Sequence, residues 1–403
     1  MLPPRSSEPE TPVARPPPPA EPAHTEPWAA RSELLARRIQ DLAGAPHCFH
    51  IPLDQDRAVT LRSSPDTQYQ SWVERRLGRS MALAGIAVAM NPSSGRLIAM
   101  SVFNEDPDQP LAFFWKTYPA ASIFKVVTAA AALDRGLLAP DSVLEYTGRP
   151  HTLYRRQLEQ KHSPWSHQVS LAESFARSIN PVFGKIGIHH LGQNVLAEYG
   201  SAFFFNQPFP CELPVQTSTL RVPDEAQKIA EVASGFNRNT LISPVQAAWI
   251  ASVIAADGSA PPPWFVESIQ SDPFSQAPPL DDQGKPVRAL PLHAARQMQA
   301  LMEATIRSGT CRQSFSDRKR YTYMRHLTFG GKTGNINDRQ SPVKYDWFVG
   351  YALGEDPEDA LALSVLMFHG EKLGHRANVM AFDLMRAYYQ QKHQAETKRR
   401  GPS

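Results

Sequence analysis

The sequence predicts an α/β (α+β) fold in which a long helical insertion separates two parts of one sheet. Two strand-like runs joined by turn residues lie near residues 82 to 102, and a second strand-like block lies between residues 323 and 368. Mostly helical patterns occupy the sequence between these blocks. The 403 residues are 42% apolar and 20% charged, which suffices for one large domain or two modest ones.

The chain is expected to begin with an irregular segment, because ten of the first 28 residues are proline. A short helix is predicted over residues 28–42, so residues 1–45 comprise a disordered tether and that helix. Residues 46–80 are predicted to be a linker region leading into the main domain at residues 81–391. The last segment, residues 392–403, is predicted to be a frayed basic tail.

The expected sheet begins with a β-hairpin whose strands are joined by Asn-Pro-Ser-Ser-Gly at residues 91–95. Its second part comprises Tyr323 to Gly331, Asp346 to Ala352 and Ala360 to Phe368. Helices are predicted at Ser122 to Arg135, Ser170 to Leu191, Pro244 to Ala256 and Leu292 to Ser308. The helical subdomain is therefore placed at about residues 130–310.

Composition excludes several classes of function. Lys and Arg total 42 against 39 Asp and Glu, and this net charge of +3 gives no reason to expect a nucleic-acid partner. The longest apolar runs are shorter than the roughly 18 to 20 residues that span a bilayer. No metal or other cofactor is expected, because the thirteen histidines form no recognisable ligand array. Three widely spaced cysteines leave the redox compartment open, and pairing of Cys211 with Cys311 stays an alternative.

Ser122 and Lys125 form a Ser-x-x-Lys motif at the start of an apolar helix. Residues three apart share one helix face, so the lysine amine would reach the serine hydroxyl. An apolar setting lowers a lysine pKa and makes the amine a base, and a serine hydroxyl needs such a base to become nucleophilic. The alternative is an N-cap serine followed by a solvated lysine. The same spacing recurs at Ser316 and Ser341, but in polar and loop-like sequence.

Two further motifs follow along the chain. Ser178-Ile179-Asn180 lies between helical patterns; its hydroxyl suits proton relay and its amide suits a substrate carbonyl, unless it is an ordinary helix cap. Lys332-Thr333-Gly334 follows a strand-like stretch, where the lysine and threonine suit a substrate carboxylate, unless the tripeptide is a surface turn.

Together, in this order, the three motifs resemble the active-site signature of penicillin-binding proteins and serine β-lactamases. The similarity extends to GIAVAMNPSSGRLIAM (85–100), VSLAESFARSINPVFGKIGIHHLG (169–192), LISPVQAAWIASVIAADG (241–258), RSGT (307–310) and DWFVGYA (346–352). These segments are similar to the transpeptidase domain of high-molecular-mass penicillin-binding proteins, and the resemblance in their order and spacing covers about residues 60–389.

The resemblance implies a mixed, mainly antiparallel sheet flanked by helices, with an inserted all-helical subdomain and the active site between them. It implies Ser122 as the acylated nucleophile, Lys125 as its base and Ser178 as a further catalytic residue. Asn180 would border the cleft, and Lys332, Thr333, Gly334 and Asn335 would bind substrate. The oxyanion hole would comprise the backbone N–H groups of Ser122 and Asn335. Asn335 departs from the family, which commonly has Thr or Ser there.

The implied activity is a peptidoglycan D,D-transpeptidase that cross-links stem peptides and is acylated by β-lactams. Its implied partners are the D-alanyl-D-alanine stem peptide, β-lactam antibiotics and other cell-wall synthesis proteins. It would act outside the cytoplasm, in the periplasm or on the outer face of the cytoplasmic membrane. An N-terminal anchor is expected, and this chain shows none.

Three alternatives share this signature. A serine β-lactamase would deacylate the same serine with water, but the chain has no Glu-x-x-Asn, and Trp347 to Gly350 occurs with Ser-x-Asn instead of Ser-x-Val. A non-catalytic scaffold or sensor would not need Ser122 and Lys125 together. A D,D-carboxypeptidase or endopeptidase would differ in the acceptor alone, which the sequence does not specify.

Overall fold

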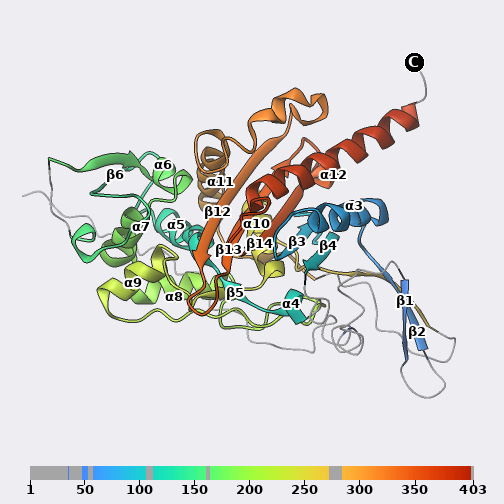
Figure 1. Cartoon of the computed structure of the whole chain (residues 1–403), viewed down its shortest axis with the longest axis horizontal. Helices are drawn as coiled ribbons and strands as arrows, with labels where there is room; N and C mark the ends of the chain where they lie inside the picture. Colours follow the sequence, from blue (N-terminus) through green and yellow to red (C-terminus); the bar gives the residue numbers. More distant parts are fainter. Residues whose placement is uncertain are drawn as a thin grey trace, which may run out of the picture.

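A single five-stranded antiparallel sheet unites the two strand-like blocks of the sequence (Figure 1). The computed structural model describes residue 35 and residues 48–52, 58–105, 112–159, 164–271 and 284–400. The sheet has the order β12-β13-β14-β3-β4. Its strands are β3 (Ala84–Met90), β4 (Leu97–Asn104), β12 (Thr328–Asn337), β13 (Lys344–Leu353) and β14 (Leu361–His369). Because β14 pairs with β3, the predicted single sheet is confirmed.

Helices cover both faces of this sheet. Leu363 and Val365 of β14 pack in one cluster with α3 (Thr67–Gly78) and α12 (Ala377–Arg400). The alternating residues Ala362 and Leu366 pack in a second cluster, with α10 (Pro244–Ala255) and α11 (Leu292–Arg307). Successive side chains of a strand point to opposite faces, so the two clusters lie on opposite sides of the sheet. The fold is therefore a helix–sheet–helix sandwich, as Figure 1 shows.

The insertion between β4 and β12 carries the remaining helices. They are α4 (Ala112–Trp115), α5 (Lys125–Asp134), α6 (Leu171–Ala176), α7 (Asn180–Ile186), α8 (Gly192–Ala202) and α9 (Ala226–Ala233). Short strand pairs also occur there: β5 (Tyr118–Pro119) with β8 (Leu241–Ile242), β6 (Val143–Tyr146) with β7 (His167–Ser170), and β9 (Ser259–Ala260) with β11 (Val287–Arg288).

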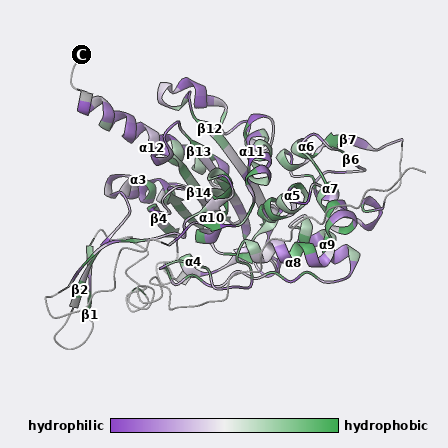
Figure 2. Ribbon diagram, turned by 180° about the vertical axis from the view of Figure 1, so that it is seen from behind, coloured by the Kyte–Doolittle hydropathy of each residue, from purple (hydrophilic) through white to green (hydrophobic). Residues whose placement is uncertain are grey.

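The prediction of an all-helical subdomain at residues 130–310 was therefore wrong in two respects. It missed the strand pairs, whose two- to four-residue strands are too short to show a period. It also included α10 and α11, which cover the central sheet. Nearly every residue of α10 is buried, and Figure 2 shows the helix largely in the hydrophobic colour. A helix that is apolar all round belongs in a core.

The prediction of a linker at residues 46–80 was also wrong. β1 (Cys48–Pro52), β2 (Ala58–Ser63) and β10 (Val266–Ser271) form a small antiparallel sheet. The Asp66 side chain caps α3 by accepting from Tyr69 N at 2.7 Å. The Tyr69 hydroxyl then donates to Leu384 O of α12 at 3.0 Å. Residues 58–80 are therefore part of the folded domain, because the buried face of α3 packs on the sheet.

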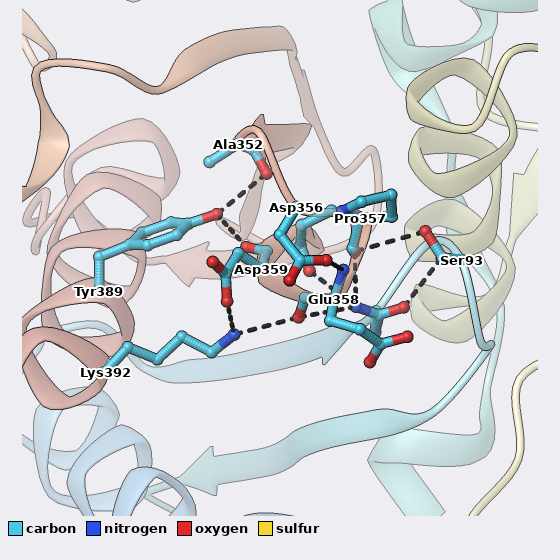
Figure 3. Close-up of polar contacts among 10 residues, drawn as sticks. Ser93, Ala352, Asp356, Pro357, Glu358, Asp359, Tyr389 and Lys392 are labelled. Carbon is cyan, nitrogen blue, oxygen red and sulfur yellow. Dashed lines mark hydrogen bonds and ion pairs between the residues drawn. The ribbon is translucent and has the colours of Figure 1, made fainter. Parts of the chain in front are cut away.

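The predicted frayed tail is helical, since α12 continues to Arg400. Its Tyr389 hydroxyl donates to Ala352 O at 3.1 Å and to Asp359 O at 2.7 Å (Figure 3). Lys392 donates to Glu358 O at 3.0 Å and forms an ion pair with Asp359. The outer turns are hydrophilic (Figure 2) and consist largely of good helix formers, so they continue the helix without apolar periodicity.

The predicted tether and helix at residues 1–45 lie outside the described residues, apart from the buried Leu35. Among the helices that the structure describes, none is both long and apolar enough to cross a membrane. All three cysteines are free, and the buried Cys211 and Cys311 belong to different core clusters. The alternative of a Cys211–Cys311 disulfide was therefore wrong.

Candidate active site

Ser122 lies in a 3₁₀ turn, Ala121–Phe124, that leads directly into α5. Ala121 has a positive φ of 47°, which turns the chain sharply before the serine. Gly235 packs against this turn so closely that a Cβ atom added to it would lie 1.9 Å from Ala121 O. The Trp347 indole also donates to Pro119 O at 2.9 Å. The start of α5 is therefore fixed from both the insertion and the sheet.

Lys125 lies one helical turn further on, fully buried. Its Nζ lies 2.8 Å from Ser122 Oγ, 2.7 Å from Asn180 Oδ1 and 2.5 Å from Ser234 O. Phe183 packs against it, with the ring centroid 5.5 Å from Nζ. Burial lowers the pKa of Lys125 well below its ordinary value, and the positive charge of Lys332 lowers it further. Lys125 therefore has the environment of a neutral amine.

The orientation of the Asn180 amide follows from its neighbours. Its Nδ2 donates to His151 O at 3.1 Å, so Oδ1 is the atom that faces Lys125. Its backbone N–H donates to Pro150 O at 2.7 Å. Asn180 is the first residue of α7, and Ser178 lies just before it with a positive φ of 58°. The predicted loop between two helices therefore exists, and it turns Ser178 toward β12.

Lys332, Thr333 and Gly334 lie inside β12, not in a turn after a strand. The strand prediction ended too early because Gly330 and Gly331 resemble turn residues. Both are needed within the sheet, since an added Cβ would lie 2.2 Å from the Tyr351 ring at Gly330 and 2.6 Å from the Phe348 ring at Gly331.

Lys332 is the second buried lysine of the site. Its Nζ donates to Ser178 Oγ at 2.9 Å and to Thr333 O at 2.8 Å. The Phe175 ring centroid lies 5.5 Å from Nζ. Burial lowers the pKa of Lys332 to about 7. Among the described residues, neither lysine forms an ion pair with a carboxylate.

β12 is an edge strand of the sheet, and it passes close to the serine turn. A Cβ atom added to Gly334 would lie 3.1 Å from both Ser122 N and Ile123 N. Asn335 follows on the exposed part of β12, opposite Asp346 of β13. The structure thus brings all the predicted site residues to one place. Ser122 lies in the 3₁₀ turn before α5 and Lys125 at the start of α5. Ser178 precedes α7, Asn180 begins it, and residues 332–335 lie on β12.

Several contributors were not predicted. The Ser234 backbone carbonyl and the Gly235 close approach leave no pattern that spacing rules detect. Thr310 was noticed only as part of the RSGT segment, yet its Oγ1 lies 2.6 Å from Thr333 Oγ1. Phe183 was not assigned either, because this ring comes from α7, far from Lys125 in the sequence.

A serine hydroxyl beside a buried lysine amine of lowered pKa, close to an edge strand that carries a second lysine, is the arrangement expected of a serine acyltransferase. The family model "Penicillin binding protein transpeptidase domain" matches residues 85–385. The chain therefore belongs to the penicillin-binding protein transpeptidase family. This match confirms the predicted family and the predicted serine-transpeptidase class.

One curated relative and two solved structures show what this chain is similar to. The chain is 26% identical over 355 residues to the peptidoglycan D,D-transpeptidase PbpA of Mycolicibacterium smegmatis, covering 80% of this chain and 70% of that protein. Penicillin binding protein 3 from Mycobacterium tuberculosis superposes with a TM-score of 0.66 at 17% identity, covering 85% of this chain and 82% of that one. An imipenem acyl-enzyme of penicillin-binding protein A from M. tuberculosis gives 0.63 at 20% identity, covering 81% and 79%. The predicted fold class, a mainly antiparallel sheet flanked by helices, is confirmed.

Proposed function

We propose that this chain is a peptidoglycan D,D-transpeptidase that forms an acyl-enzyme at Ser122. The observation that carries the proposal is the 2.8 Å contact between Ser122 Oγ and the Nζ of a fully buried Lys125. The substrate class follows from the curated relative, a peptidoglycan D,D-transpeptidase. The imipenem complex of the structural relative supports acylation by β-lactams.

The hydrogen bonds of Lys125 indicate how it acts as the base. A neutral amine has two N–H donors and one lone pair. Asn180 Oδ1 and Ser234 O only accept hydrogen bonds, so they take the two donors. The lone pair is then left for the Ser122 hydroxyl proton. Oγ attacks the peptide carbonyl as its proton moves to Nζ, which forms the acyl-serine ester after the amine leaves.

Lys332 and Thr333 are proposed to bind the C-terminal carboxylate of the stem peptide. Lys332 has one N–H more than its two protein acceptors use when it is charged. Thr333 adds a hydroxyl beside it, and Asn335 extends the same edge. The edge strand β12 also offers unpaired backbone groups to an extended peptide.

Ser178 is proposed to return a proton to the leaving amine. Its Oγ accepts from Lys332 Nζ at 2.9 Å, which leaves its own O–H free to donate into the cleft. The oxyanion of the tetrahedral intermediate would accept from the backbone N–H groups of Ser122 and Asn335. The approach of Gly334 to Ser122 N supports this pairing.

The test is acyl transfer from a D-alanyl-D-alanine stem peptide to an amine acceptor. We expect the purified protein to release D-alanine and form the cross-linked amide, and Ser122→Ala to do neither while keeping its fold. Release of D-alanine without amide would indicate a carboxypeptidase. Sustained nitrocefin hydrolysis at many turnovers per second would indicate a β-lactamase.

A non-catalytic scaffold is the remaining alternative. It predicts no D-alanine release and no covalent adduct, although ligands would still bind. The intact hydrogen-bond set around Lys125 argues against it, because a scaffold gains nothing from a buried, unpaired lysine beside a serine.

The site of action is proposed to be outside the cytoplasmic membrane, on its outer face or in the periplasm, as expected for a cell-wall enzyme. The proposed partners are peptidoglycan stem peptides, β-lactams and further cell-wall synthesis proteins. Protection of the chain from added protease in intact cells, lost when the outer compartment is opened, is the expected result of a localisation test.

A further inference from the structure

Basic side chains gather on two segments that the proposed catalysis does not use. One comprises the short turns η4 (Ser316–Arg320) and η5 (Thr322–Met324) together with Arg325, and the other is α12. The two segments carry nine lysines and arginines against three carboxylates, whereas the whole chain has a net charge of only +3. The rest of the chain is therefore net negative, and positive charge is concentrated on these two segments.

The two segments lie side by side (Figure 1). The Tyr323 ring stacks on the His393 ring with the centroids 5.6 Å apart. The Arg386 guanidinium lies 5.4 Å from the Tyr321 ring centroid and donates to the Tyr321 hydroxyl at 3.4 Å. The cations of both segments therefore belong to one region of the molecule, which we refer to as the basic surface.

Most cations of the basic surface are not neutralised by the protein. Two of its three carboxylates are paired within it, since Asp317 contacts Arg320 at 3.3 Å and Asp383 contacts Arg386 at 3.5 Å. Among the described side chains, five cations of the surface have no carboxylate partner: Arg318, Lys319, Arg325, Lys398 and Arg399. The surface therefore presents uncompensated positive charge to the solvent.

The surroundings of these cations indicate what kind of partner they suit. Among the described residues, none of the large apolar side chains exposed to solvent lies on η4, η5 or α12, so the surface has no hydrophobic anchor. Lys319, Lys398 and Arg399 are exposed, and their side chains form no hydrogen bond with any described residue. Flexible cations of this kind do not preset a rigid ligand site, but they match a surface whose charges can rearrange beneath them.

We infer that the basic surface binds the anionic headgroups of a phospholipid bilayer by electrostatic attraction, without inserting into the bilayer. An anionic lipid offers a phosphodiester, and lateral diffusion lets such lipids gather beneath the cations. The proposed site of action on the outer face of the cytoplasmic membrane brings such a bilayer within reach. This inference goes beyond the transpeptidase reaction, because none of the cations named takes part in it.

The test is sedimentation of the full chain with lipid vesicles. One set consists of phosphatidylcholine alone, and the other also contains about 40% phosphatidylglycerol. At about 50 mM salt we expect at least about tenfold more binding to the anionic vesicles, and at about 500 mM salt no difference, because salt screens the attraction. The triple variant Lys319→Gln, Lys398→Gln, Arg399→Gln should bind the anionic vesicles at least about tenfold less.

The matched control is the triple variant Arg155→Gln, Arg156→Gln, Arg221→Gln. It removes three exposed arginines from the insertion and changes the net charge by the same amount. The control should bind the anionic vesicles as the unaltered protein does. Acylation by penicillin should change less than about twofold in both variants, which shows that both are folded.

Three results would overturn the inference: no preference of the unaltered protein for anionic vesicles, full binding by the first triple variant, or equal losses in both variants. Binding of long-chain inorganic polyphosphate without any vesicle preference would also overturn it, and would indicate a soluble polyanion as the partner. Failure of the proposed function looks different, because the protein would then form no penicillin adduct whether or not it binds vesicles.

Discussion

Two buried lysines in one site differ in what surrounds them. Lys125 has three oxygen atoms within hydrogen-bond distance, those of Ser122, Asn180 and Ser234. Lys332 has two acceptors, so its charged form has one N–H to spare. Burial lowers both pKa values, but the consequences differ. A neutral Lys125 is an active base, whereas Lys332 attracts a carboxylate only while it is charged.

Lys332→Met is expected to stabilise the fold and impair the site. Burial depresses the pKa of Lys332 to about 7, against about 10.4 in an unfolded chain. The unfolded state therefore binds more protons between these pH values, and stability rises as pH rises from about 7 to about 10. We expect the variant to gain about 1 to 3 kcal/mol in the free energy of unfolding below pH 7. The gain should disappear near pH 10.

Urea unfolding across this pH range measures the effect, and penicillin acylation should fall at least about tenfold in the same variant. A variant that is less stable than the parent at pH 6 would show that Lys332 is not an uncompensated buried charge.

Gly235→Ala is expected to disable the nucleophile turn. Gly235 has φ +65°, and an added Cβ would lie 1.9 Å from Ala121 O. Ser122 must then move or the fold must loosen. We expect acylation to fall at least about a hundredfold and the free energy of unfolding to fall by about 1 to 3 kcal/mol. Gly136→Ala is the matched control, because Gly136 has φ +62° at the end of α5 but nothing within 4 Å of the added atom.

The control should lose some stability from backbone strain but keep its acylation rate. Equal acylation losses in both variants would mean that positive φ, and not the contact with the serine turn, explains the effect.

At the scale of elements, prediction from sequence succeeded where a pattern was local. The hairpin of β3 and β4 has an apolar run on each side of Asn-Pro-Ser-Ser-Gly, and the helices α10 and α11 follow their apolar spacing. It failed where a partner far along the chain decides the structure. β12 continues through Gly330 and Gly331. Glycine is required at both positions because rings of β13 occupy the space that side chains would fill. α3 is held partly by α12, where the Tyr69 hydroxyl donates to Leu384 O, 315 residues later in the sequence.

The last helix gives a prediction at this scale. Tyr389 donates to Ala352 O and Asp359 O, which ties α12 to the β13–β14 connection (Figure 3). Tyr389→Phe keeps the packing and leaves two buried acceptors with fewer donors. We expect a loss of about 1 to 2 kcal/mol in unfolding free energy and no change in acylation, since the site is on other elements. An acylation defect in a folded variant would contradict that separation.

At the scale of the whole molecule, the active site forms only when distant segments meet. Ser122, Ser178 and Lys332 were predicted as site residues because each belongs to a short motif. The prediction that these residues lie in one site came from the family resemblance, and the structure shows how they are arranged. Ser234 and Gly235 illustrate what stays hidden, because a backbone carbonyl and a close approach have no distinctive side chain.

The reactivity of the three cysteines towards a thiol reagent tests the packing of the fold. Cys48 is exposed, whereas Cys211 and Cys311 are buried, and burial raises the pKa of each buried thiol to about 12. A thiol reagent should therefore react with one cysteine in the native protein and with three in denaturant. Three fast-reacting thiols under native conditions would contradict the packing of both core clusters.

The central claim is that Ser122 is the acylated residue, with Lys125 as its base. The most direct measurement is mass spectrometry of the protein after brief penicillin treatment, with the adduct located by peptide mapping. We predict one penicilloyl group per chain, on the peptide that contains Ser122, and none in Ser122→Ala or, at short times, in Lys125→Ala. A single adduct on any other residue, or a Lys125→Ala variant that acylates at the parent rate, would contradict the account.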